Sequence, residues 1–262
     1  LENPHFASAV QGALDAFEGS RFHLMFGQTG YSEALGADIV DALLPFRPAA
    51  LIFTGVVLSE PARDALRGFG VPVMEIWGDS DRAVDMAAGA SIQAGARLMG
   101  AHLAERGYRH IAYCGHTQMP GGAGLTGLRE GLRPAGLDVA HILPMEGTGT
   151  MARGMQAIRD IVRDCPKCDA IFFGSDLLAV GGLIGARDMG LDTPGKIAIA
   201  GYGDLDFAAH MQPPLTTVRV SDYETGRLAG ASLRRQPEGG TPGDRVIQVP
   251  MELVVRASTP PR

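Results

Sequence analysis

Short apolar segments alternate with segments of helical apolar spacing along almost the whole chain, and this alternation restricts the fold more than any other feature. Four strand candidates in the first half (22–26, 50–54, 71–76 and 110–114) are each followed by a helical pattern. The connections between them are short, and several contain glycine. Strands and helices that alternate in this way are typical of βαβ units and a parallel sheet. The chain is therefore predicted to be an α/β protein.

The second half repeats this plan, with strand candidates at 139–143, 170–173 and 197–200 and helix candidates at 128–133, 151–164 and 177–189. A further helix candidate (222–235) and two strand candidates (246–249 and 252–255) close the chain. The repetition predicts two doubly wound parallel-sheet subdomains with a ligand cleft between their strand ends. We assign residues 1–114 and 220–249 to an N-terminal subdomain. Residues 115–219 and 250–262 form the C-terminal subdomain in this prediction.

The segment 196–220 concentrates the polar groups expected at such a strand end. Its apolar strand ends in Gly201-Tyr202-Gly203-Asp204, and a second carboxylate, Asp206, follows. Pro213-Pro214 then forces an extended path into a β-branched run. Ligands of open α/β sheets bind at the carboxyl ends of the strands. The segment is therefore predicted to face a ligand, and the alternative is a surface loop with two solvated carboxylates.

Composition excludes several classes of protein. The 262 residues carry a net charge of −6 with an isoelectric point near 5.6, the opposite of a basic nucleic-acid surface. Any DNA contact must therefore come from residues outside this chain. No apolar run approaches the ~20 residues that span a bilayer, and no secretory signal opens the sequence. Because three cysteines argue against a disulfide framework, we expect a cytoplasmic protein without membrane contact.

Motifs for metal binding, phosphate binding and catalysis are missing or incomplete. The pair Cys165 and Cys168 lacks the further ligands of a structural zinc site and is interpreted as two thiols in a turn. The glycine-rich loop 115–124 lacks the Gly-Lys-Ser/Thr ending of a P-loop and is interpreted as a flexible loop on the ligand side. A catalytic carboxylate pair would have to be Asp176 and Asp204. We expect no metal, no cofactor and no enzymatic activity.

Several segments together make the sequence resemble the lactose-repressor/galactose-repressor (LacI) family of bacterial transcriptional regulators. They cover nearly the whole chain: Asn3-Pro4-His5-Phe6, the run from Ile171 to Gly181, the stretch Gly201 to Val218 with its Pro-Leu-Thr-Thr-Val, and the ending Glu252 to Thr259. Together they are specific, although each alone is a weak signal. The segment Pro72 to Trp77, followed by Asp85-Met86, is similar to the branch that includes gluconate-operon repressors.

This resemblance implies a periplasmic-binding-protein type I core, in which two subdomains joined by three crossovers bind a sugar-like effector and dimerise. Full-length relatives begin with a helix-turn-helix and a hinge helix, and neither occurs in these 262 residues. The first strand of the core would also precede Leu1. The chain is therefore expected to be an effector-binding fragment that reaches operator DNA through an N-terminal domain absent here.

The resemblance also implies where the effector binds. His5 and Phe6 fall where the family packs aromatic or polar groups against the ligand. Ser175-Asp176 falls where an Asn-Asp or Ser-Asp pair faces it, and Gly203-Asp204 falls where an Asp binds hydroxyl groups. Two departures affect the effector's identity. The expected loop arginine is Gly124, and the first Asp of the Gly-Tyr-Asp-Asp pattern is Gly203.

A sugar or sugar acid needs polar groups that converge beside an aromatic face. Neighbouring strand ends supply the remaining candidates for such a site: Gln28, Thr29, Trp77, His116 and Thr148. An anionic effector also needs a cation, for which Arg153 and His116 are the hypotheses. The alternative for each of these residues is that it caps a helix or faces solvent.

Taken together, these features predict the effector-binding and dimerisation core of a regulator that senses a small sugar or gluconate-like sugar acid. Effector binding would change the affinity of a homodimer for operator DNA. An exported sugar-binding protein of a transport system would share the core but needs a signal peptide, and the Glu252 to Arg256 ending favours the regulator.

Overall fold

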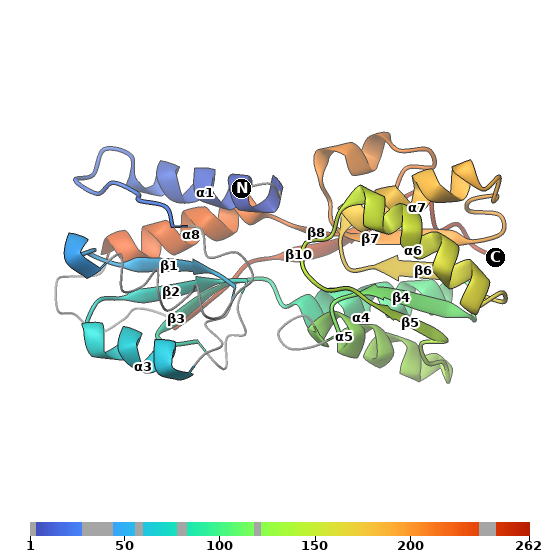
Figure 1. Cartoon of the computed structure of the whole chain (residues 1–262), viewed down its shortest axis with the longest axis horizontal. Coiled ribbons are helices and arrows are strands. Elements are labelled where there is room, and N and C mark those ends of the chain that lie inside the picture. Colours follow the sequence, from blue (N-terminus) through green and yellow to red (C-terminus); the bar gives the residue numbers. More distant parts are fainter. Residues whose placement is uncertain (1–3, 28–43, 56–59, 78–82, 118–121, 236–244) are drawn as a thin grey trace. The chain divides into compact units, whose positions relative to one another are not determined.

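The computed structural model describes the chain except for residues 1–3, 28–43, 56–59, 78–82, 118–121 and 236–244. It divides into two compact units, which confirms the predicted α/β fold of two parallel-sheet subdomains (Figure 1). Unit 1 comprises Leu1–Ser91 and Ser221–Pro250, and unit 2 comprises Ile92–Val220 and Met251–Arg262.

The first boundary between the units differs from the predicted one at residue 114. The helix α4 (Ile92–Glu105) and the strand β4 (Ile111–Gly115) both belong to unit 2. The reason is pairing that the local sequence pattern does not reveal. Strand β4 lies between β5 (His141–Pro144) and β6 (Ala170–Phe173) in one sheet, so it cannot leave unit 2.

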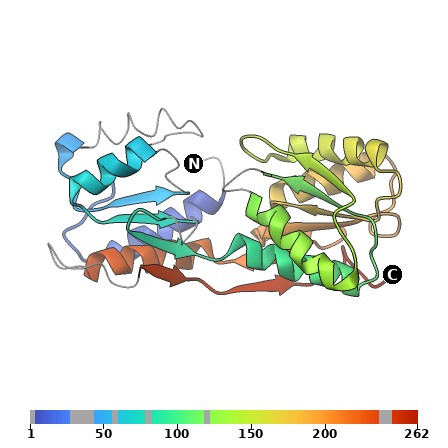
Figure 2. The ribbon, with the colours of Figure 1, turned by 90° about the horizontal axis from the view of Figure 1, so that it is seen from below.

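Unit 1 is a four-stranded sheet in the order β1-β2-β3-β9, and all its strand pairs are parallel. Helices α1 and α8 cover one face and α3 covers the other (Figures 1 and 2). The 3₁₀ turn η1 (Leu44–Phe46) precedes β1. The remaining bounds are β1 Leu51–Thr54, β2 Val73–Ile76, β3 Met86–Gly89, β9 Val246–Gln248, α1 Pro4–Phe17, α3 Glu60–Phe69 and α8 Asp222–Arg235.

The predicted strand 22–26 is wrong: these residues form no regular element. Their apolar residues alternate as in a strand, but the described residues offer no strand that pairs with them. Phe22 instead packs edge-on against Phe17 at the end of α1, with ring centroids 5.8 Å apart. Phe26 is 58% exposed. The alternation of apolar residues alone therefore predicted a strand that these residues do not form.

Unit 2 is a six-stranded sheet in the order β10-β8-β7-β6-β4-β5, in which only the β10–β8 pair is antiparallel. The 3₁₀ turns η3 (Arg133–Ala135) and η4 (Asp206–His210) follow α5 and β7. The remaining bounds are α5 Gly122–Leu132, α6 Met151–Asp164, α7 Asp176–Asp188, β7 Ala198–Gly203, β8 Thr216–Val220 and β10 Met251–Val254.

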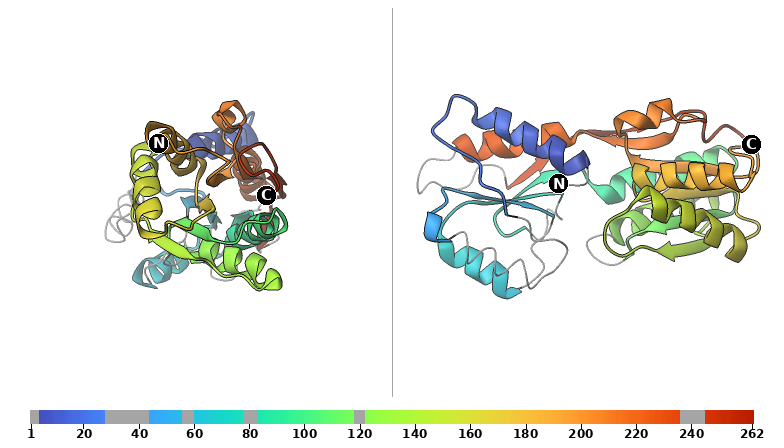
Figure 3. Two further views of the ribbon diagram at one scale, coloured as in Figure 1. Left: turned by 90° about the vertical axis from the view of Figure 1, so that its right-hand side faces the viewer. Right: turned by 45° about the horizontal axis from the view of Figure 1, so that its top comes forward.

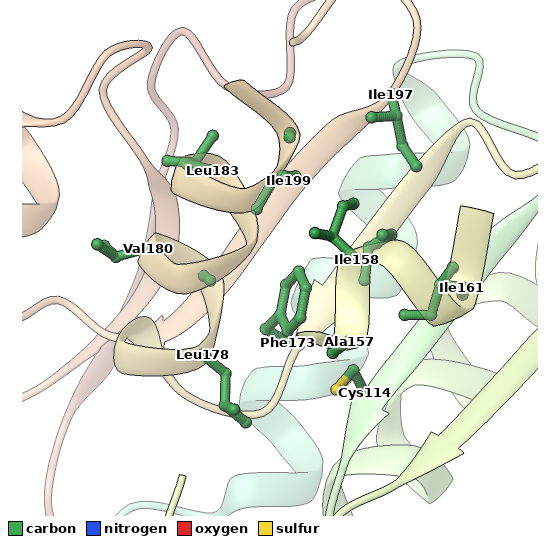
Figure 4. Packing of buried hydrophobic residues seen from close by; sticks show 14 of the residues in the cluster. Cys114, Ala157, Ile158, Ile161, Phe173, Leu178, Val180, Leu183, Ile197 and Ile199 are labelled. Carbon is green, nitrogen blue, oxygen red and sulfur yellow. The ribbon is translucent and has the colours of Figure 1, made fainter. Parts of the chain in front are cut away.

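A buried apolar cluster joins α6 and α7 to one face of the unit 2 sheet (Figure 4). Phe173 of β6 and Ile199 of β7 meet Ile158 of α6 and Leu183 of α7, all at most 3% exposed. Strands β4, β6 and β7 are buried on both faces, as expected in a covered parallel sheet. This packing fixes the carboxyl ends of the strands. The candidate site residues of unit 2 come after these ends in the chain.

Candidate functional site

In unit 1, four side chains from three separate segments meet at the carboxyl end of the sheet. His5 and Phe6 lie in the first turn of α1, Trp77 directly follows β2, and Asp222 opens α8. His5 Nδ1 donates to Asp222 Oδ2 at 2.5 Å, and Trp77 Nε1 donates to Asp222 Oδ1 at 3.0 Å. The Phe6 and Trp77 rings pack edge to face with centroids 5.2 Å apart. We call these four residues the unit 1 cluster.

The unit 1 cluster combines a carboxylate with aromatic surface. The Asp222 side chain is 11% exposed and that of His5 is 18% exposed, so the hydrogen bond between them is largely shielded from water. Ser221 caps α8 by accepting a hydrogen bond from the Glu224 amide, which places Asp222 in the first turn. A carboxylate there is stabilised by the helix dipole. The cluster can therefore hold a negative charge beside two aromatic rings.

The backbone of Trp77 is unusual for so large a residue. Its φ is 60°, in the left-handed region that glycine normally occupies. Its amide donates to the Ala88 carbonyl of the next strand, and its indole bonds Asp222. Strained backbone of this kind persists where surrounding contacts hold it and is concentrated at functional sites.

In unit 2, the predicted residue Asp176 has a structural position. It is fully buried, accepts the Thr217 hydroxyl at Oδ1 (2.6 Å) and accepts the Leu205 amide at Oδ2 (2.8 Å). A role for Asp176 in ligand binding stays a prediction. The carboxylate ties the start of α7 to β8 and to the loop after β7. Its neighbour Ser175 caps α7 by accepting the Leu178 amide at 3.4 Å.

Asp204 lies in the loop after β7 and is held by two arginines. Its Oδ2 contacts Arg219 Nε at 2.6 Å and its Oδ1 contacts Arg256 Nη2 at 2.7 Å. Arg219 also pairs with Glu252 of β10. Asp204 has a φ of 55°, and the preceding Gly203 has a φ of 131°. These contacts fix the loop. A role for Gly203 and Asp204 in ligand binding stays a prediction.

The other unit 2 candidates follow β4 and β5. His116 is exposed, and its carbonyl accepts the Tyr113 hydroxyl at 3.2 Å. Arg153 is exposed and its Nη1 donates to the carbonyls of Glu146 and Thr148, the latter at 3.2 Å. The guanidinium therefore braces the segment that carries Thr148. Whether either cation contacts an effector stays a prediction.

Gly124, which stands where the resemblance leads us to expect an arginine, packs against Tyr113. A Cβ at Gly124 would lie 2.6 Å from the Tyr113 hydroxyl oxygen, and one at Gly115 would meet the same oxygen at 2.6 Å. Burial raises the pKa of the Tyr113 phenol, so it stays protonated. The Tyr113 hydroxyl thus fills the space that a side chain at residue 124 would need. Gln28 and Thr29 lie outside the described residues.

Neither catalysis nor a metal receives support from the described part of the chain. Its residues include no group of three or more His, Cys, Asp or Glu side chains that could hold a metal ion. Separately, none of the described helices is long and apolar enough to cross a membrane. Burial raises the pKa of the Cys168 thiol to about 12, and its Sγ donates to the Ala170 carbonyl at 3.2 Å. The Cys165–Cys168 pair is therefore a turn with one buried, protonated thiol. Asp176 and Asp204, the suggested catalytic pair, are both engaged as described above.

Asp222 is the site residue that sequence reasoning missed. Asp222 follows strand β8 by two residues and opens a helix, a strand-end position like those of the predicted candidates. That strand-end position was the signal by which the sequence could have indicated Asp222 as a site residue. What the sequence lacks is any sign that Asp222 meets His5 and Trp77, which are 217 and 145 residues away.

Comparison with known proteins agrees with this architecture. A model of the periplasmic binding protein-like domain matches residues 101–259. The HTH-type transcriptional regulator GntR of Escherichia coli (strain K12) is 27% identical over 258 residues, 97% of this chain and 76% of its own length. The ribose operon repressor of the same strain is 27% identical over 232 residues, 87% of this chain and 70% of its own.

Two solved structures are similar over nearly their whole length. A LacI family transcriptional regulator from Silicibacter pomeroyi has a TM-score of 0.90 at 27% identity, covering 98% of this chain and 95% of its own. The transcription regulator GntR from Chromobacterium violaceum also has a TM-score of 0.90 at 27% identity, covering 99% and 96%. These relatives are regulators, and the alternative of an exported transport protein is not supported.

Proposed function

This chain belongs to the family of periplasmic binding protein-like domains, as the effector-binding core of a LacI-type transcriptional regulator, and from this premise we propose that its effector is a small sugar acid. The observation that carries the proposal is the unit 1 cluster. An aromatic pair with a carboxylate and an imidazole beside it suits a polyhydroxylated molecule, whose CH groups pack on the rings while its hydroxyls bond the polar groups.

A sugar acid is preferred to a neutral sugar because of the branch to which the chain is similar. The segment Pro72 to Trp77 and the regulators named GntR both support that choice. The acid group needs a cation, and with Gly124 in place of the loop arginine the candidates are Arg153 and His116. In unit 2, Thr148 and Ser175 are candidates for further contacts with hydroxyl groups.

The regulatory step would follow from differential binding. An effector changes the affinity for DNA only as far as it binds two conformations of the regulator with different affinity. We propose that the working protein is a cytoplasmic homodimer, and that operator DNA is contacted by a helix-turn-helix domain outside these 262 residues. This division of labour fits the net charge of −6 of the present chain.

The test is a thermal-denaturation screen of this chain against gluconate, other aldonic acids and neutral sugars. A ligand at 100 times its dissociation constant adds about 2.7 kcal/mol to the free energy of unfolding, which is visible as a raised melting temperature. We expect the sugar acids to raise it. Stabilisation by neutral sugars alone would contradict the acid preference, and stabilisation by neither class would contradict the proposed effector.

The regulatory part is tested in the full-length protein. The effector found in the screen should change the Kd for operator DNA, and operator DNA should change the affinity for the effector by the same factor, because the coupling is reciprocal. An effector that binds without altering the operator Kd would contradict regulation by this ligand.

A further inference from the structure

We propose that Asp222 is the residue of unit 1 that selects the effector, by accepting hydrogen bonds from two adjacent hydroxyl groups. The inference rests on the proposed function and names the part of the effector that unit 1 recognises: its polyol chain, not its acid group. Neither the resemblance to LacI-type regulators nor the predicted set of site residues includes Asp222.

The first step is the hydrogen-bonding capacity of the carboxylate. An ionised carboxylate has about four acceptor positions and no donor. Among the described residues, Asp222 accepts from His5 Nδ1 at Oδ2 and from Trp77 Nε1 at Oδ1, so each oxygen has one such partner. With respect to the described part of the chain, each oxygen therefore keeps one acceptor position. Two adjacent hydroxyl groups can fill these positions together, in a bidentate arrangement.

The second step is charge. Asp222 is 11% exposed, so the acid group of an effector would meet a shielded negative charge without water to screen it. Hydroxyl groups, which donate, face no such repulsion. Asp222 lies in the first turn of α8, where the amide N–H groups of the helix point toward its carboxylate end. The local electrostatics therefore favour the hydroxyl end of a sugar acid over its carboxylate end.

The third step is the shape of the surroundings. The Phe6 and Trp77 rings are packed at 71° to each other, and the indole N–H is directed at Asp222. The positive φ of Trp77 is a strained conformation, and the Asp222 bond is one of the contacts that hold it. The same residue thus fixes the aromatic surface and offers the acceptor atoms beside it.

The experiment uses a reporter that the chain already contains, because Trp77 is its only tryptophan. Binding of gluconate, glucitol and hexanoate is followed by Trp77 fluorescence in the wild-type chain and in Asp222→Asn. The amide keeps an acceptor for the Trp77 N–H but replaces the other acceptor with a donor. The matched control is Asp15→Asn, which removes an equal charge from the α1–α8 contact, where Asp15 accepts the Tyr223 hydroxyl at 2.7 Å.

We expect Asp222→Asn to weaken gluconate binding about 10- to 100-fold, the usual range for hydrogen bonds to a charged group. Asp15→Asn should bind like the wild type, and hexanoate, which lacks hydroxyls, should not bind. A direct contact also predicts that at least one monodeoxy gluconate loses about tenfold in the wild type and little in Asp222→Asn. A purely structural role of Asp222 would not produce this coupling.

Equal gluconate affinity in Asp222→Asn and the wild type overturns the inference and leaves the proposed function intact. Absence of any response of the wild type to sugars or sugar acids overturns both. If Asp222→Asn does not fold, Trp77→Phe provides the second test. Ligand binding by this variant is measured as a rise in its melting temperature. It keeps the carboxylate, so it should still distinguish gluconate from the monodeoxy compounds. Loss of that distinction would overturn the inference.

Discussion

At the scale of single residues, His102 of α4 is the buried ionisable group with the clearest consequence for stability. It is 6% exposed, and its Nε2 lies 2.8 Å from the Thr259 hydroxyl. That hydroxyl donates its proton to Thr216, so His102 Nε2 must be the donor to Thr259. Burial, and then the charge of Arg106, lower the pKa of His102 from 6.5 to about 4.

This shift predicts a pH dependence of stability. Between pH 6.5 and 4 the unfolded chain binds a proton at His102 and the folded chain does not, so stability falls as the pH falls through this window. The loss should be about 2 kcal/mol at pH 5 relative to pH 7.5. In His102→Gln, whose amide can still donate to Thr259, urea unfolding at both pH values should show a decrease smaller by that amount.

The matched control for this experiment is His210→Gln, at an exposed position of the same unit. It should keep the wild-type decrease. Equal decreases in His102→Gln and the wild type would contradict a buried neutral His102.

At the scale of elements, the contact between α1 and α8 carries the unit 1 cluster, since His5, Phe6 and Asp222 belong to these helices. They lie side by side (Figures 1 and 3) and approach closely through glycines. A Cβ on Gly226 would lie 1.8 Å from the Ala9 carbonyl oxygen, and one on Gly12 would lie 2.0 Å from that of Tyr223. Small residues therefore set the distance between the two helices.

We predict that Gly226→Ala destabilises the chain by about 2–3 kcal/mol, because the methyl group must push α1 away from α8. The control is Gly68→Ala in α3, where a Cβ meets nothing within 4 Å and φ is not positive. That change should stabilise by about 0.5–1 kcal/mol through the entropy of the unfolded chain. Urea unfolding of both variants measures the difference. A neutral Gly226→Ala would show that the helices separate without cost.

At the scale of the whole molecule, net charge restricts what these 262 residues can bind by themselves. A net charge of −6 opposes association with a polyanion, and non-specific DNA binding depends on Lys and Arg that neutralise phosphates. We therefore predict that the 262-residue chain does not bind duplex DNA at about 10 µM protein and physiological salt. Fluorescence anisotropy of labelled DNA measures this, and binding that weakens as salt rises would contradict it.

Much of the fold and part of the site could be predicted because the relevant signals are local. Apolar strands such as β6 and β7 and the helix start at Ser175 are encoded in neighbouring residues. His5, Phe6 and Trp77 could be named from resemblance and strand-end position, and the structure brings them together. The predicted strand 22–26 failed because a strand needs a partner, which its own alternation cannot supply.

Local periodicity and strand-end chemistry were thus enough for the α/β class, the repeated plan and the edge at which polar groups gather. Only tertiary structure decided how those groups are used. Asp176 and Asp222 are both carboxylates in the first turn of a helix that follows a strand. Asp176 is buried and accepts hydrogen bonds from Thr217 and Leu205, whereas Asp222 accepts hydrogen bonds from His5 and Trp77. The difference arises from residues distant in sequence, because solvent exposure and hydrogen-bond partners are properties of the packed chain.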